Sequence, residues 1–105
     1  MMMHTMERYF SKDDDMETTD AIAEAVLRTC MTEGVKVLVN PTDYTSRANI
    51  MWAGTVAHND ITGCGTTGDW ATHCIEHELS GMFDVSHGAG LAAVWGSWAR
   101  YTRQE

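Results

Sequence analysis

Three histidines close together in the second half of the chain are the side chains with the clearest capacity for chemistry. His73 and His77 are four residues apart, and His87 follows ten residues later, directly before a glycine. On a helix, residues four apart lie on one face, one turn above the other. Neutral imidazoles are good ligands for divalent transition metals. The spacing therefore predicts a cation site, with His87 on a second element that folds back toward the first.

Spacing alone leaves a second interpretation open. A histidine on an apolar helix face is more often a hydrogen-bonded core residue than a ligand, but the position of His87 at a predicted helix start favours the metal. His4, far upstream on another predicted helix, is the candidate for a further ligand. His58 is less favoured, because it lies at a predicted helix end beside a glycine-rich loop.

Two other segments have residue types that can bind ligands. Residues 63–68 hold three of the nine glycines, but they contain no Walker A lysine and no strand precedes them. A flexible connection is therefore favoured over a phosphate-binding loop. Residues 13–15 are three aspartates, and such a run is more typical of a solvated loop or a helix N-terminus than of a metal site.

The elements that must position these side chains are predicted to be helices. Apolar periodicity, capping residues and turn signals predict about five of them, over residues 2–10, 18 or 19 to about 33, about 44–59, 70 to about 80, and 86 or 87 to 102. Thr19 or Asp20 is the expected N-cap of the second helix, and Gly34 its expected C-terminal stop. Residues 35–39 are interpreted as the tail of that helix or as an irregular connector. Thr42 or Asp43 is expected to cap the third helix, and Asp69 the fourth.

The same periodicity predicts which helix faces are buried. On three of the predicted helices, a stripe of mostly apolar or small side chains is expected to face the core. The stripes are Ala21, Ile22, Ala25, Val26 and Cys30 on the second helix; Ala48, Met51, Trp52, Thr55 and Val56 on the third; and Leu91, Val94, Trp95, Trp98 and Tyr101 on the last.

Composition limits the classes of function. The 105 residues are enough for about one domain, with 44% hydrophobic and 21% charged residues, which is ordinary for a soluble globular protein. A net charge of -8 argues against a nucleic-acid partner, which requires clustered Lys and Arg. No apolar run is long enough to span a bilayer and no signal peptide is evident, so we expect a cytoplasmic protein. Three widely spaced cysteines are expected to be reduced thiols.

Several longer motifs carry a resemblance to a known family. They are residues 4–9 (HTMERY), 47–54 (RANIMWAG), 69–73 (DWATH), 76–80 (EHELS) and 84–92 (DVSHGAGLA). With these motifs, essentially the whole chain resembles the C-terminal helical domain of the iron-containing (group III) alcohol dehydrogenases, and most of all their NAD(P)H-dependent butanol dehydrogenase branch.

This resemblance implies an all-α fold, a partial dehydroquinate synthase-like helical domain that occupies residues 1–105 as a single metal-binding domain. It also implies site residues. His4, His73 and His87 match the three histidine ligands of a divalent metal, usually Fe2+ or Zn2+. His77 matches the histidine that lies beside the nicotinamide and assists substrate binding or proton transfer, and we expect it to be the catalytic residue.

The chain also departs from the family pattern. The aspartate that completes the family's ligand set would fall just before residue 1, and the Rossmann-like domain that binds the nucleotide has no counterpart, so no cofactor-binding residue is predicted. We therefore expect NAD(P)H to act only with the missing N-terminal domain. Three imidazoles and water would suit Zn2+, Co2+ or Ni2+ better than Fe2+.

Two functions follow as expectations. The first is the metal-bearing part of an oxidoreductase, an alcohol dehydrogenase or aldehyde reductase for small primary alcohols and aldehydes, inactive by itself. The alternative is a stand-alone helical module that binds a divalent metal or self-associates without catalysis. Whether the chain acts as an enzyme stays open between them. In both cases we expect a homo-oligomer, because a helical domain without its covering partner exposes apolar surface.

Overall fold

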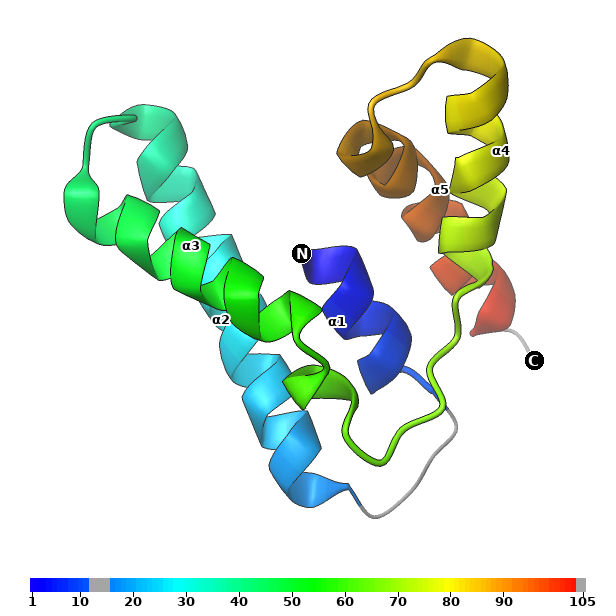
Figure 1. The fold of residues 1–105 in the computed structure, drawn as a ribbon, viewed down its shortest axis with the longest axis horizontal. Coiled ribbons are helices and arrows are strands. Elements are labelled where there is room, and N and C mark those ends of the chain that lie inside the picture. Colours follow the sequence, from blue (N-terminus) through cyan, green and yellow to red (C-terminus); the bar gives the residue numbers. More distant parts are fainter. Residues whose placement is uncertain (12–15, 104–105) are drawn as a thin grey trace. The chain divides into compact units, whose positions relative to one another are not determined.

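The computed structural model describes residues 1–11 and 16–103, and within these ranges all regular secondary structure is helical (Figure 1). In chain order the elements are the α-helices α1 (Met2–Tyr9), α2 (Glu17–Val39) and α3 (Tyr44–His58), the 3-10 helix η1 (Ile61–Gly63), and the α-helices α4 (Ala71–Phe83) and α5 (His87–Thr102). The predicted all-α fold is confirmed. The elements form two compact units, residues 1–68 and 69–105, and the single domain over 1–105 stays a prediction. The aspartates at 13–15 lie outside the described residues.

The first unit is built on the α2–α3 hairpin, with α1 and η1 packed against it (Figure 1). Its apolar centre consists of Val26 and Cys30 from α2 and Ala53 and Ala57 from α3. The small alanine side chains allow the two helix backbones to approach closely. A hydrogen bond also links α2 to the segment after η1: the Thr19 hydroxyl donates to the Cys64 carbonyl at 2.8 Å.

Helix α2 is longer than predicted at both ends. It begins after Met16, which makes no side-chain capping hydrogen bond, so the predicted N-cap at Thr19 or Asp20 is wrong. The predicted stop at Gly34 is also wrong, since the helix continues to Val39 and residues 35–39 are its tail. Gly34 does not end the helix, because a glycine does so when it adopts the left-handed conformation, and Gly34 does not adopt it. The helix ends instead before Asn40, because Pro41 disfavours a helical conformation in the residue that precedes it.

Helix α3 begins where the sequence predicts. The Asp43 carboxylate accepts from the Thr45 amide at 3.1 Å and from the Ser46 amide at 3.5 Å, as expected of an N-cap. The predicted buried face is mostly wrong: Val56 packs against the core, but Met51 is 73% exposed and Trp52 is 68% exposed. The face toward α2 consists of smaller residues, because only these fit at the close approach of the two helices.

Differences of the same kind occur in α2 and α5. Val26 and Cys30 are buried as predicted, but Ala21 and Ala25 are exposed and Ala23 is buried instead. In α5, Leu91 is buried at 3% exposure, whereas Tyr101 is 58% exposed. Periodicity alone cannot determine the face that meets a neighbour, because the neighbour decides it.

The second unit is the pair α4 and α5, which lie against each other (Figure 1). Its buried residues are few and mostly polar or small: Thr72, His73, Glu76, Gly90 and Leu91. A buried imidazole and a buried carboxylate are costly unless they are paired, so their presence in this small unit suggests a functional site.

None of the helices within the described ranges is both long enough and apolar enough to cross a bilayer.

Candidate metal centre

Helix α4 presents its polar face to α5. Positions 73, 76, 77 and 80 are spaced three or four residues apart, so they share one side of the helix. Asp69 fixes the start of this helix: its carboxylate accepts from the Ala71 amide at 3.0 Å and from the Trp98 indole N–H of α5 at 3.2 Å. The predicted cap is one residue off, since Trp70 directly precedes α4 and makes no side-chain capping hydrogen bond, but the Asp69 carboxylate accepts from the first amide of the helix and ties α4 to α5.

A tight connection returns the chain from α4 to α5. Asp84 follows the last residue of α4 in the left-handed conformation, with φ of 53°, and its amide donates to the Ser80 carbonyl. Helix α5 begins at His87, and the Ser86 carbonyl accepts from the Gly90 amide at 2.9 Å. This short turn places His87 beside the polar face of α4, as the sequence predicts.

Three imidazoles meet at this place. The ring centroids of His73 and His87 are 5.4 Å apart, those of His77 and His87 are 5.5 Å apart, and those of His73 and His77 are 6.1 Å apart. Two imidazoles that share one ion at about 2 Å from each nitrogen hold their ring centroids roughly 5 Å apart. These spacings are those of imidazole pairs that can share a divalent cation, but the group whose ligand atoms all lie within 4.8 Å of one another is Glu76, His77 and His87, without His73. His73 is buried, whereas His77 and His87 are exposed.

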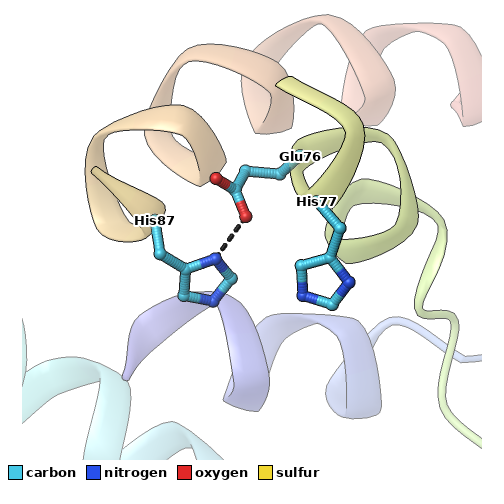
Figure 2. A group of neighbouring side chains, drawn as sticks. All are labelled: Glu76, His77 and His87. Atoms are coloured by element: carbon cyan, nitrogen blue, oxygen red, sulfur yellow. Dashed lines mark hydrogen bonds and ion pairs between the residues drawn. The ribbon is translucent and has the colours of Figure 1, made fainter. Parts of the chain in front are cut away.

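Glu76 is the residue of this site that the sequence reasoning did not single out. It is fully buried, and Figure 2 shows its carboxylate directed at the His87 ring. Oε2 of Glu76 is hydrogen-bonded to Nδ1 of His87. Its second oxygen, Oε1, accepts from the Ser80 hydroxyl. Potential ligand atoms of Glu76, His77 and His87 lie within 4.8 Å of one another. The position of Glu76 one turn after His73 and directly before His77 could have indicated it.

The hydrogen bond from Ser80 is the largest of the influences that hold the pKa of the Glu76 carboxyl below its ordinary value. Burial acts in the opposite direction, and the hydrogen bond with His87 and the electrostatic interactions with His87 and His77 lower the pKa of Glu76 further. The carboxyl group is therefore ionised at neutral pH and acts only as an acceptor.

His4 belongs to the other unit. It lies on α1, and its ring centroid is 4.4 Å from that of His58, near the end of α3. The structure therefore brings together three of the four histidines predicted for the site, namely His73, His77 and His87. The role of His4 as a ligand stays a prediction, and so do the roles assigned to the other three.

Comparisons with known proteins identify the family of this chain. The sequence profile of the Fe-containing alcohol dehydrogenase family, C-terminal, matches residues 1–105. NADH-dependent butanol dehydrogenase A of Clostridium acetobutylicum is 43% identical over 101 residues, which are 96% of this chain and 26% of that protein. The NADPH-dependent aldehyde reductase YqhD of Escherichia coli is 44% identical over 92 residues, which are 88% of this chain and 24% of that protein.

Solved structures give the same result. The crystal structure of NADH-dependent butanol dehydrogenase A from Thermotoga maritima superimposes with a TM-score of 0.91 at 40% identity, over 95% of this chain and 25% of that chain. The chain thus spans about a quarter of the length of the relatives that it matches. The sequence match and the helical fold together show that this chain belongs to the iron-containing alcohol dehydrogenase family and corresponds to that family's C-terminal region.

Proposed function

We propose that this chain is the metal-binding helical part of an NAD(P)H-dependent alcohol dehydrogenase or aldehyde reductase that acts on small primary alcohols and aldehydes. Membership of the family supports the reaction class, and the names of the relatives, butanol dehydrogenase and aldehyde reductase, support the substrate class. The single observation that carries the proposal is the convergence of His73, His77 and His87 from two helices.

In this proposal His73, His87 and His4 supply imidazole nitrogens to a divalent metal, Fe2+ or Zn2+, with Co2+ and Ni2+ as ions that the same nitrogens would accept. When bound, such a metal supplies Lewis-acid polarisation of an alcohol or carbonyl oxygen. His77 is exposed on the same helix face, and its ring stacks on that of His87 with an interplanar angle of 29°. We assign it the transfer of a proton to or from the substrate oxygen, since imidazole exchanges protons near neutral pH.

The nicotinamide cofactor belongs to the proposal for the whole enzyme. No strand occurs in the described ranges, so a strand-based dinucleotide site has no counterpart there. We therefore expect the 105-residue chain, assayed by itself with NADPH and butyraldehyde, to show no turnover. Cytoplasmic location stays a prediction.

A second candidate function is a non-catalytic module that self-associates. The observation that favours it is the set of large apolar side chains exposed in the first unit, among them Leu38 at 83% and Trp52 at 68%. A module that only self-associates would bind no stoichiometric metal, whereas a non-catalytic module that binds a divalent metal differs from the first function in catalysis alone.

Elemental analysis of the purified chain tests the proposed function. After exposure to Zn2+, or to Fe2+ without oxygen, and removal of unbound ions, we expect about one metal ion per chain. A His73→Ala, His87→Ala double variant should lose this ion, and a His4→Ala variant should bind it more weakly. His58→Gln is the matched control, because it removes an imidazole outside the proposed set. Equal metal content in the double variant and the unmodified chain would contradict the site.

A further inference from the structure

Two helices enclose the carboxylate of Glu76. The side chain is fully buried on α4, and α5 covers it at Gly90. A Cβ atom added at Gly90 would lie 2.7 Å from both Cγ and Oε1 of Glu76, so the α5 backbone lies directly against the carboxylate. A carboxylate held this closely and away from water needs specific partners, because an unpaired buried charge is strongly destabilising.

Each oxygen of this carboxylate has such a partner. Oε1 accepts from the Ser80 hydroxyl on the same helix, and Oε2 is bonded to Nδ1 of His87 (Figure 2). Since the ionised carboxylate can only accept, Nδ1 of His87 must be the donor and carries the proton. In a neutral imidazole the other nitrogen, Nε2, then has the lone pair, and only a nitrogen with a lone pair can bind a metal ion.

We infer that Glu76 is a positioning residue for His87. Its carboxylate fixes the His87 ring in the Nδ1–H tautomer, so that Nε2 of His87 is available to a divalent cation. This inference rests on the proposed function, because it assigns His87 to the metal. Metal-bound histidines commonly donate their second N–H to a carboxylate, and this bond fixes the tautomer and the ring orientation.

The alternative is that Glu76 binds the cation itself, together with His77 and His87, as the distance of 4.8 Å among their ligand atoms would permit. The contacts favour the positioning role. Both oxygens of Glu76 are engaged by Ser80 and His87, and the side chain has no exposed surface. His77 and His87, by contrast, are exposed.

The first test is the tautomer of His87 in the metal-free chain, measured by long-range 1H–15N correlation with labelled histidine above neutral pH. In the unmodified chain we expect the Nδ1–H form to predominate. Glu76→Gln keeps the size of the side chain, but its amide can offer either a donor or an acceptor, so the preference for Nδ1–H should weaken. Glu78→Gln is the matched control, because Glu78 is an exposed carboxylate on the same helix. An unchanged tautomer ratio in Glu76→Gln would overturn the inference.

The second test is a double-mutant cycle on metal affinity, measured by Zn2+ titration against a competing chelator. Glu76→Gln should weaken Zn2+ binding by about 10- to 100-fold, the usual effect of removing such a supporting carboxylate. In a His87→Ala background the same change should cause no further loss, because Glu76 then has no ligand to position. An equal loss in both backgrounds would identify Glu76 as a direct ligand and overturn the inference. If the unmodified chain binds no metal, the proposed function fails, while the tautomer measurement still decides the role of Glu76.

Discussion

At the scale of single residues, two of the charged side chains that are buried in the described part of the chain, Glu76 and Arg8, have different tasks. Glu76 faces histidines at the candidate metal centre, whereas Arg8 has the contacts of a structural residue. The Arg8 guanidinium donates to the Ala57 carbonyl at 2.9 Å and to the Thr62 hydroxyl at 3.1 Å, and it pairs with Asp60. These bonds tie α1 to the end of α3 and to η1. The planar fork of arginine, with several donors at set angles, suits such a role.

Replacing Arg8 by lysine should destabilise the chain more than replacing its charged partner. Arg8→Lys removes donors from the buried Ala57 carbonyl and Thr62 hydroxyl, and we expect it to lower the free energy of unfolding by about 1–3 kcal/mol. Asp60→Asn should cost less than about 1 kcal/mol, because the Asp60 side chain is 85% exposed and asparagine tolerates the left-handed backbone of that position. Urea unfolding followed by circular dichroism measures both values. Equal losses of unfolding free energy in the two variants would mean that the Arg8–Asp60 ion pair, and not the buried hydrogen bonds of Arg8, stabilises the fold.

At the scale of elements, the candidate centre depends on how closely α5 approaches α4. Gly90 lies at the point of contact, where a side chain has no room beside Glu76. Gly88, two residues earlier on the same helix, faces open space, with nothing within 4 Å of an added Cβ. Packing thus explains the glycine at position 90 but not the one at position 88, and the sequence pattern His-Gly-Ala-Gly does not distinguish them.

Gly90→Ala should damage the metal site, and Gly88→Ala should not. The added methyl group at position 90 must displace the Glu76 carboxylate or separate the helices, and either change removes the support of His87. We expect Zn2+ affinity to fall by about 10-fold or more, as for loss of the carboxylate. Gly88→Ala should leave the affinity unchanged and raise stability slightly, because alanine favours the helix by up to about 1 kcal/mol. Metal titration and thermal unfolding of the two variants check this, and equal affinities would show that the contact at position 90 is unimportant.

At the scale of the whole molecule, the first unit exposes several large apolar side chains on the α2–α3 hairpin. Leu38 and Val39 at the end of α2 are 83% and 81% exposed, and Tyr44 at the start of α3 is 83% exposed. Trp52 lies further along α3 and is also exposed. Single exposed apolar residues are ordinary, but several large ones on one helical hairpin are typical of a surface that meets another protein surface.

We expect the chain to associate in solution through this hairpin. Size-exclusion chromatography with light scattering at micromolar concentration should give a dimer or a larger assembly. A Leu38→Glu, Trp52→Glu variant should shift the population toward monomer, because it places charge in the apolar surface. Thr32→Glu, Asn49→Glu is the control, since it adds the same charge at exposed polar positions of the same helices. A monomer in the unmodified chain would contradict the expectation.

What the sequence alone determined was local in origin. The helix starts near Tyr44 and His87, a cap at Thr42 or Asp43, and the shared face of His73 and His77 all follow from short-range hydrogen bonding and from the period of the helix. Long motifs were also sufficient to indicate the family. These features depend on residues that are near one another in the chain.

Only the tertiary structure decided which surfaces meet. Met51 and Trp52 were predicted to be buried and are exposed, because the packed face of a helix is chosen by its neighbour, here through the small side chains of Ala53 and Ala57. Glu76 resembles an ordinary solvated glutamate in the sequence. Its spacing from His73 and His77 could have marked it as part of the site, but its contact with His87 exists only because α5 folds back over it at Gly90.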